Sequence, residues 1–88
     1  MKYEVRLSNR AQRDLDRVDR PTQKRVVERL ELLADDPYNP RISGWLEGHP
    51  GLRKSRLGGW RIIYQALDDK RVVIVAMFER RGQVYKRI

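Results

Sequence analysis

Apolar and polar positions alternate at the start of the chain, over Lys2–Leu7. A period of two residues is typical of a β-strand with one buried face, so this segment is predicted to be the first strand. Farther along, apolar residues recur at helical spacing, at Ala11, Leu15 and Val18 in one run and over Val26–Ala34 in the next. Each run predicts an amphipathic helix.

Residues that start or stop helices mark the boundaries of these two runs. Ser8 or Asn9 can cap the first helix, while the second can begin near Pro21 and end before Asp35. The short connection between them predicts a helical hairpin. The first helix is expected to turn its charged residues to water: Arg10, Arg13, Asp14 and Arg17.

The segment Asp36–Gly51 is rich in proline and glycine, and a loop of this length suggests a functional role. Three strand-like segments follow, over Leu52–Leu57, Trp60–Leu67 and Arg71–Phe78. The short polar or glycine-rich connections between them are suited to hairpins. The last segment is apolar on both faces, which predicts a central strand.

These elements predict an α+β fold in one domain, residues 1–88. We expect an N-terminal strand, a helical hairpin and then a mainly antiparallel sheet of about four strands, with the helices on one face.

The positive charge of the chain is concentrated in its second half. The formal net charge is +8, and Trp45–Ile88 carries ten Lys and Arg against four Asp and Glu, whereas Met1–Gly44 carries ten against eight. A sequence pI of about 10.4 favours an acidic partner, either nucleic acid or an acidic protein.

The composition also narrows the chemistry. Cysteine is absent, which excludes disulfides, thiolate nucleophiles and cysteine-based zinc sites. No His, Asp and Glu cluster has metal-ligand spacing, so neither a metal nor another cofactor is expected. The first residues contain no secretion signal and no apolar run is long enough for a membrane helix, so a cytoplasmic location is expected.

Cations gather on the predicted strands of the second half. The period of two places Lys54 and Arg56 on one face of their strand and Arg53 on the other. Arg61 begins the next strand and can reach the same patch. Such a group is suited to a phosphodiester, although Lys and Arg on an exposed sheet edge are also common devices against aggregation. Beyond the last long strand lie further cations and an aromatic residue that can stack on a base: Arg80, Arg81 and Tyr85.

The order of motifs resembles the RelE-type toxins of bacterial toxin–antitoxin systems. The residues that carry this resemblance are L-x-G-H-P-G-L over Leu46–Leu52, a basic strand, G-G-W-R-I-I-Y ending at Tyr64, then V-V-I-V and a final R-R-x-x-V-Y. The resemblance covers essentially the whole chain. It implies a small cytoplasmic endoribonuclease that cuts mRNA in the ribosomal A site, needs no cofactor and is neutralised by an antitoxin protein that wraps around it.

The resemblance also implies roles for single residues. Lys54, Arg61, Arg81 and Tyr85 match positions that imply catalytic roles. Arg56, Arg53 and Arg80 are then expected to bind the RNA phosphates. This chain departs from many relatives just before the final arginine pair, where it has Phe78 and Glu79 in place of a His or Lys.

Metal-free RNA cleavage uses the 2′-hydroxyl as the nucleophile, so a base, a group that stabilises the phosphorane and an acid are needed. Lys54 is the first candidate for the base, because neighbouring cations favour its neutral form. Arg81 would act on the leaving group. Glu47 and His49 offer a different pairing of carboxylate base and imidazole acid, although His49 also fits simple turn chemistry.

Two rival functions remain open. ParE-type toxins share this architecture and poison DNA gyrase, and a non-catalytic nucleic-acid-binding module would have a similar charge. The aromatic residues Trp45 and Trp60 are expected to pack on the edge of the core, and Tyr3 and Tyr64 within it. The basic stripe of the first helix is interpreted as a solvated face, with contact to ribosomal RNA as the alternative.

Overall fold

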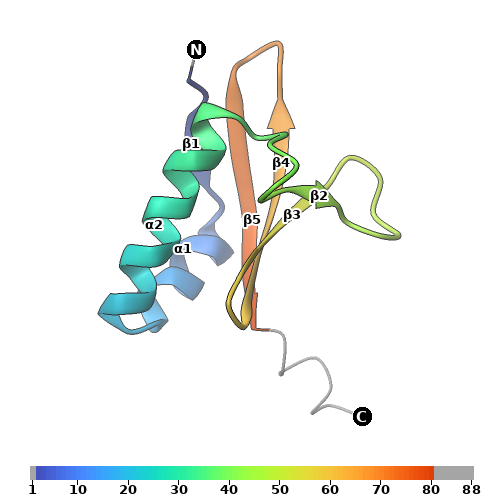
Figure 1. Ribbon diagram of the computed structural model, residues 1–88. Coiled ribbons are helices and arrows are strands. Elements are labelled where there is room, and N and C mark those ends of the chain that lie inside the picture. The colour runs from blue at the N-terminus through green and yellow to red at the C-terminus, as the bar shows by residue number, and fades with distance from the viewer. Residues whose placement is uncertain (1, 81–88) are drawn as a thin grey trace.

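The computed structural model describes residues 2–80, and in these a helical hairpin covers one face of a five-stranded sheet (Figure 1). The strand order is β1-β5-β4-β3-β2. The elements are β1 Glu4–Leu7, α1 Asn9–Arg17, α2 Arg20–Asp35, β2 Gly44–Trp45, β3 Arg53–Leu57, β4 Trp60–Leu67 and β5 Val72–Arg80.

The predicted α+β fold with a helical hairpin is confirmed, and the sheet is mixed. β1 pairs in parallel with β5, while the remaining neighbours are antiparallel. The parallel pair arises because the two helices and three strands between β1 and β5 return the chain to the same end of the sheet. Strand β5 is therefore an interior strand, with β1 on one side and β4 on the other, as its apolar sequence predicts.

The fifth strand, β2, lies inside the segment predicted to be a loop. Gly44 pairs with Lys54 and Trp45 pairs with Arg53. A strand of two residues has no measurable period, so only its pairing with β3 reveals it. The pairing fixes the loop to the edge of the sheet.

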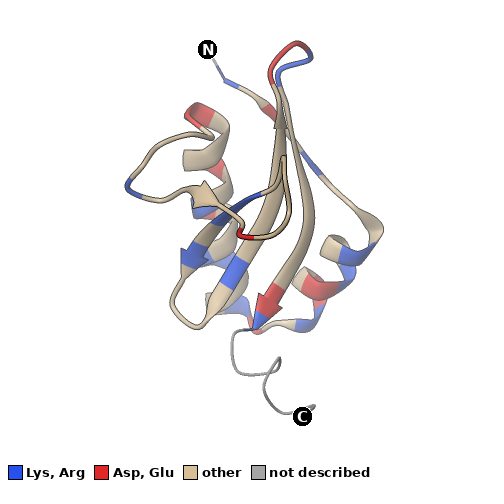
Figure 2. Cartoon of the chain, turned by 90° about the vertical axis from the view of Figure 1, so that its right-hand side faces the viewer, with Lys and Arg blue, Asp and Glu red and all other residues tan. Residues whose placement is uncertain are grey.

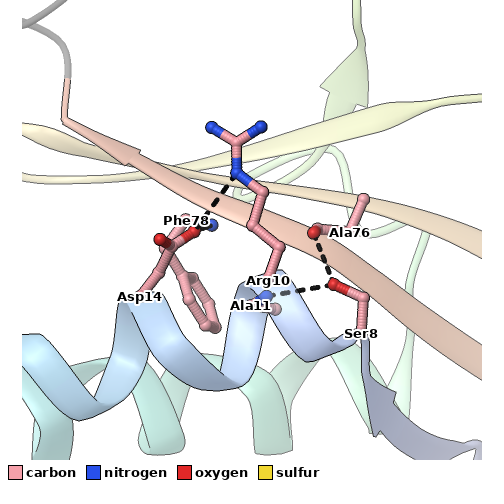
Figure 3. Close-up of polar contacts among 6 residues, drawn as sticks. All are labelled: Ser8, Arg10, Ala11, Asp14, Ala76 and Phe78. Atoms are coloured by element: carbon pink, nitrogen blue, oxygen red, sulfur yellow. Dashed lines mark hydrogen bonds and ion pairs between the residues drawn. The ribbon is translucent and has the colours of Figure 1, made fainter.

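The start of α1 is held to β5 by Ser8 (Figure 3). The Ser8 hydroxyl accepts the backbone N–H of Ala11 at 3.0 Å, as an N-cap does, and donates to the carbonyl of Ala76 at 2.6 Å. The Ser8 hydroxyl thus caps the N-terminus of α1 and also satisfies a backbone carbonyl of β5.

The expectation that Asp14 faces water is wrong. Its carboxylate accepts the backbone N–H of Phe78 on β5 at 3.2 Å and lies 3.8 Å from the Nε atom of Arg10 (Figure 3). Strand β1 pairs with β5 only as far as Val75, so this N–H lies on a stretch of β5 that β1 does not cover. A side chain of α1 supplies the acceptor that a strand would otherwise provide.

A register shift interrupts the pairing of β4 with β5. Ile63 pairs with Met77 and Tyr64 with Val75, so Ala76 is an extra residue on β5. Because one added residue reverses the faces of all that follow, Phe78 points into the core and its successor points to the opposite face.

The hydrophobic core lies between the helices and the sheet. Tyr64 and Phe78 are buried there among aliphatic side chains of both layers, and Trp60 packs at its edge as predicted. Tyr3, predicted to lie within the core, is only partly buried and packs at its edge. Trp45 differs from the prediction, because 66% of its surface is exposed. No helix in the part of the chain that the structure describes has the length and apolar character needed to cross a membrane.

Candidate functional site

The face of the sheet turned away from the helices carries a group of cations on β3 and β4. Arg56 is directly opposite Arg61, and two residues farther along the strands Lys54 is opposite Ile63. Figure 2 shows this face, with basic segments of the two strands side by side and the acidic end of β5 next to them. The predicted alternation of β3 is confirmed, since Arg53 and Ser55 are buried on the helix side.

Two hollows divide this basic face between them. The first, here called the Arg61 hollow, measures about 500 Å³, and the second, the Arg41 hollow, about 230 Å³. Lys54 lines both, whereas Arg61 lines only the first and Arg56 only the second. The residues of the Arg61 hollow are Leu46, Glu47, His49, Leu52, Lys54, Arg61, Ile63, Met77 and Glu79. Those of the Arg41 hollow are Pro40, Arg41, Ile42, Ser43, Gly44, Lys54 and Arg56.

The wall of the Arg61 hollow is the loop between β2 and β3. The backbone N–H of Leu46 donates to the carbonyl of Leu52 at 3.0 Å, and the N–H of Leu52 donates to the carbonyl of His49 at 3.1 Å. Gly48 and Gly51 adopt positive φ angles of 79° and 85°, which the closed loop requires and glycine permits. Leu46 and Leu52 of this loop line the hollow together with Ile63, which is buried.

This loop brings the two sequence-based catalytic proposals together. Glu47 and His49 are exposed, yet both line the same hollow as Lys54 and Arg61. A carboxylate, an imidazole, an ammonium and a guanidinium therefore surround one space. Such a set can bind an anion and can also give or take a proton.

Arg61 has a carboxylate partner that the sequence alone did not reveal. Its Nε donates to Glu79 at 3.0 Å, and a second guanidinium nitrogen also contacts that carboxylate. About a quarter of each side chain is exposed, 29% for Arg61 and 24% for Glu79. The sequence signal was Glu79 itself, the acidic residue at which this chain departs from many relatives.

The Arg41 hollow is framed by a segment fixed to the core through Tyr64. The Tyr64 hydroxyl donates to the carbonyl of Pro37 at 2.5 Å and lies 2.5 Å from the hydroxyl of Ser43. Ser43 also accepts the Nε–H of Arg53 at 2.8 Å. Hydrogen bonds at Pro37 before Arg41 and at Ser43 after it therefore fix the segment that carries Arg41.

Arg53 and Arg80, both predicted to bind phosphate, lie apart from this cation group. Arg53 is 9% exposed and stacks on Tyr38 and Trp45, at 5.0 and 4.6 Å from the ring centroids. Arg80 lies 5.7 Å from the ring centroid of Trp60 and lines a different hollow of about 540 Å³, beside α1 and α2. Both follow from strand alternation, which turns these side chains to the helix side of the sheet.

The other two predicted catalytic residues, Arg81 and Tyr85, lie outside the described residues. Within residues 2–80, no three His, Cys, Asp or Glu side chains converge in a way that would hold a metal ion.

A separate polar cluster joins the end of α2 to the β4–β5 turn. Asp68 accepts hydrogen bonds from the hydroxyls of Tyr3 at 2.8 Å and Tyr38 at 2.5 Å. These bonds lower the pKa of Asp68, and the same carboxylate raises the pKa of Tyr3 and raises that of Tyr38 to about 12. The cluster fixes the loop after α2 to the sheet and takes no part in the Arg61 hollow.

The helical hairpin on one face of the sheet and the cation-lined hollows on the other define a small α+β protein with an open basic face. Over residues 5–85 the chain matches a family model described as the ParE toxin of the type II toxin–antitoxin system parDE. The chain therefore belongs to this family of type II toxins, and its relatives place it among the RelE-type toxins of the RelE/ParE superfamily.

Three relatives illustrate the similarity. An Escherichia coli protein described as RelE-like toxin is 29% identical over 97% of this chain and 92% of its own length. A chain of the RelBE2 toxin–antitoxin complex from Mycobacterium tuberculosis is 26% identical, with a TM-score of 0.81 over 92% of this chain and 100% of that one. The isolated E. coli RelE toxin is 25% identical, with a TM-score of 0.77 over 97% of this chain and 93% of that one.

Proposed function

We propose that this toxin is a ribosome-dependent mRNA endoribonuclease that inhibits translation. The observation that carries the proposal is the meeting of Lys54 and Arg61 in one open hollow, beside Glu47 and His49. Two cations can hold the scissile phosphate there, and three groups that can transfer protons lie within the same space.

In the proposed reaction the 2′-oxygen attacks the adjacent phosphorus and the bond from phosphorus to the 5′-oxygen breaks. The products are a 2′,3′-cyclic phosphate and a 5′-hydroxyl. Arg61 stabilises the charge on the phosphorane oxygens, since Glu79 holds its guanidinium in place before the substrate arrives. Lys54 removes the proton of the 2′-hydroxyl, and Glu47 is the second candidate for that role.

Protonation of the leaving 5′-oxygen has two candidates. Arg81, which the family resemblance implies, is a poor acid because a guanidinium holds its proton tightly at neutral pH. His49 carries an imidazole, a common general acid, and lines the hollow beside Lys54 and Arg61, which supports it for this role. Tyr85 is proposed to stack on a base. In either case the ribosome would orient the mRNA and supply much of the rate acceleration through positioning.

The partners of this function are an antitoxin, the ribosome and mRNA in the cytoplasm. Solved relatives include complexes named as RelE with RelB, which supports a protein antitoxin of the same type for this chain. An acidic or amphipathic segment of that antitoxin would complement the basic face.

Two observations favour a second function, poisoning of DNA gyrase. The family model that matches the chain is named for ParE toxins. In addition, Glu79 neutralises part of the charge of Arg61, which weakens the case for a phosphate site. The two functions differ in their target, so they can be separated by direct assay.

The test is primer extension on a defined mRNA in cell-free translation, with initiation blocked in a parallel sample. The wild-type chain should produce new ends within the translated region, bearing 5′-hydroxyls, only when initiation proceeds. Lys54→Ala and Arg61→Ala should abolish them, while Lys70→Ala, which removes one charge from the β4–β5 turn, should not. Intact mRNA together with inhibited gyrase supercoiling would contradict the nuclease and establish the alternative.

A further inference from the structure

Beside the space proposed for the scissile phosphate lies a second cation-lined space, the Arg41 hollow. We propose that it binds the neighbouring phosphate of the same RNA chain, with Arg41 as its principal ligand. This inference rests on the proposed nuclease function and adds a binding site and a residue to it.

The two hollows are placed so that one RNA chain can occupy both. Lys54 on β3 lines both hollows. Arg61 on the neighbouring strand β4 lines the Arg61 hollow, and Gly44 on the other neighbouring strand, β2, lines the Arg41 hollow. Neighbouring strands are about 4.8 Å apart, so the hollows are separated by one to two strand spacings. A single-stranded RNA that crosses the strands can thus place consecutive phosphates on either side of Lys54.

The charge of the Arg41 hollow favours an anion more strongly than that of the Arg61 hollow. Its lining contains three cations, Arg41, Lys54 and Arg56, and no carboxylate. Glu47 and Glu79 both line the Arg61 hollow. Within residues 2–80 none of the three cations takes part in an ion pair. Their mutual repulsion is relieved when a phosphate enters.

The backbone that carries Arg41 is ordered by local hydrogen bonds. The side chain of Asn39 accepts the N–H of Arg41 at 3.0 Å, and the carbonyl of Asn39 accepts that of Ile42 at 3.1 Å. Ile42 packs against the hydrophobic core and Ser43 contacts Tyr64. Arg41 therefore projects from a segment that is already fixed, which lowers the entropy lost on binding.

The residue opposite Lys54 keeps the hollow open. Gly44 pairs with Lys54 on β2, and a Cβ atom added to it would meet nothing within 4 Å. Side chains that face each other across two strands project to the same side of the sheet. A valine at this position would consequently extend into the hollow without changing any charge, from a Cβ atom that meets no neighbour.

The experiment compares two 2′-O-methyl ligands that cannot be cleaved, a dinucleotide with one phosphate and a trinucleotide with two. The affinity of the full chain for each is measured by NMR titration at low salt. The ratio of trinucleotide to dinucleotide affinity should fall by roughly two- to fivefold in Arg41→Ala, as expected for loss of one exposed charge pair. Gly44→Val should lower the ratio as well, since it blocks the space.

Matched controls separate this effect from net charge and from misfolding. Lys70→Ala removes the same unit of charge and should keep the wild-type ratio, and Arg41→Lys should restore most of it. Equal ratios in wild type, Arg41→Ala and Gly44→Val, with unchanged thermal melts, would overturn the second phosphate site, as would the absence of binding by the wild type. A ratio that falls as expected while translated mRNA stays intact would refute the nuclease but not the phosphate site.

Discussion

Glu79 faces Arg61 directly across β4 and β5, and its carboxylate holds the guanidinium on the open face of the sheet. The pair positions Arg61 but also places a negative charge where an RNA phosphate is proposed to bind. Glu79→Gln keeps a hydrogen-bond acceptor and removes that charge. We expect the variant to bind a single-stranded RNA oligonucleotide roughly two- to fivefold more tightly at low salt, measured by fluorescence anisotropy.

The salt dependence provides the control for this prediction. The gain should shrink as the salt concentration rises, because a charge effect is screened. Weaker binding by Glu79→Gln would show instead that the ion pair itself is needed to present Arg61.

His49 and Glu47 share the Arg61 hollow with Lys54. Substitutions can show which of the three residues acts as the acid and which as the base. If His49 is the acid, His49→Ala should lower cleavage of translated mRNA by roughly 100-fold or more. A loss below about tenfold would return that role to Arg81. Glu47→Gln and Lys54→Ala, compared in the same assay, should identify the base by the larger loss.

The carboxylate of Asp14 should stabilise the fold through the N–H of Phe78. Asp14→Ala leaves that N–H without its acceptor and should lower the free energy of unfolding by about 1–3 kcal/mol in urea denaturation. Asp14→Asn retains an acceptor oxygen and should lose less than about 1 kcal/mol. Equal losses in the two variants would mean that the hydrogen bond contributes little.

The cluster of Asp68, Tyr3 and Tyr38 should make stability depend on pH at both extremes. The folded pKa of Asp68 is lowered from 3.8, so its contribution is present above that value and is lost as pH falls through the folded pKa. The pKa of Tyr38 is raised from 10.0 to about 12, so its contribution is complete below pH 10 and is lost as pH rises toward 12.

Melting temperatures measured from pH 2 to 11 on the wild type and Asp68→Asn give the test. The difference between the two proteins should be constant between about pH 5 and 9 and should shrink at both ends. A difference that does not vary with pH would exclude the carboxylate as the source.

The extra residue Ala76 decides to which face of the sheet each later residue of β5 points. Its deletion would leave Met77, Phe78 and Glu79 opposite their present partners on β4 and on the same faces, in a regular ladder without a bulge. The deleted chain should therefore still unfold cooperatively, with a melting temperature lowered by loss of the hydrogen bond between the Ser8 hydroxyl and the Ala76 carbonyl. Ala76→Ser keeps the bulge and should melt close to the wild type. Loss of cooperative thermal unfolding in the deletion variant would show that the bulge itself is needed for the fold.

Much of the fold follows from local patterns that the chain carries in its sequence. The alternation in β1 and β3, the cap at Ser8 and the apolar β5 were all predicted, because each depends on residues that are neighbours along the chain. The placement of Lys54, Arg56 and Arg61 on one face follows from the same period of two and a short turn.

The tertiary structure decided the features that depend on residues far apart in the chain. Asp14 accepts a hydrogen bond from β5 because β1 is too short to cover that part of the strand. Arg61 forms an ion pair because the extra residue Ala76 places Glu79 on the same face of the sheet. Arg41 reaches the cation group only because Tyr64 fixes its segment to the sheet. A period read along one segment gives the faces of that segment, whereas partners across the sheet are set by register and packing, which no single segment contains.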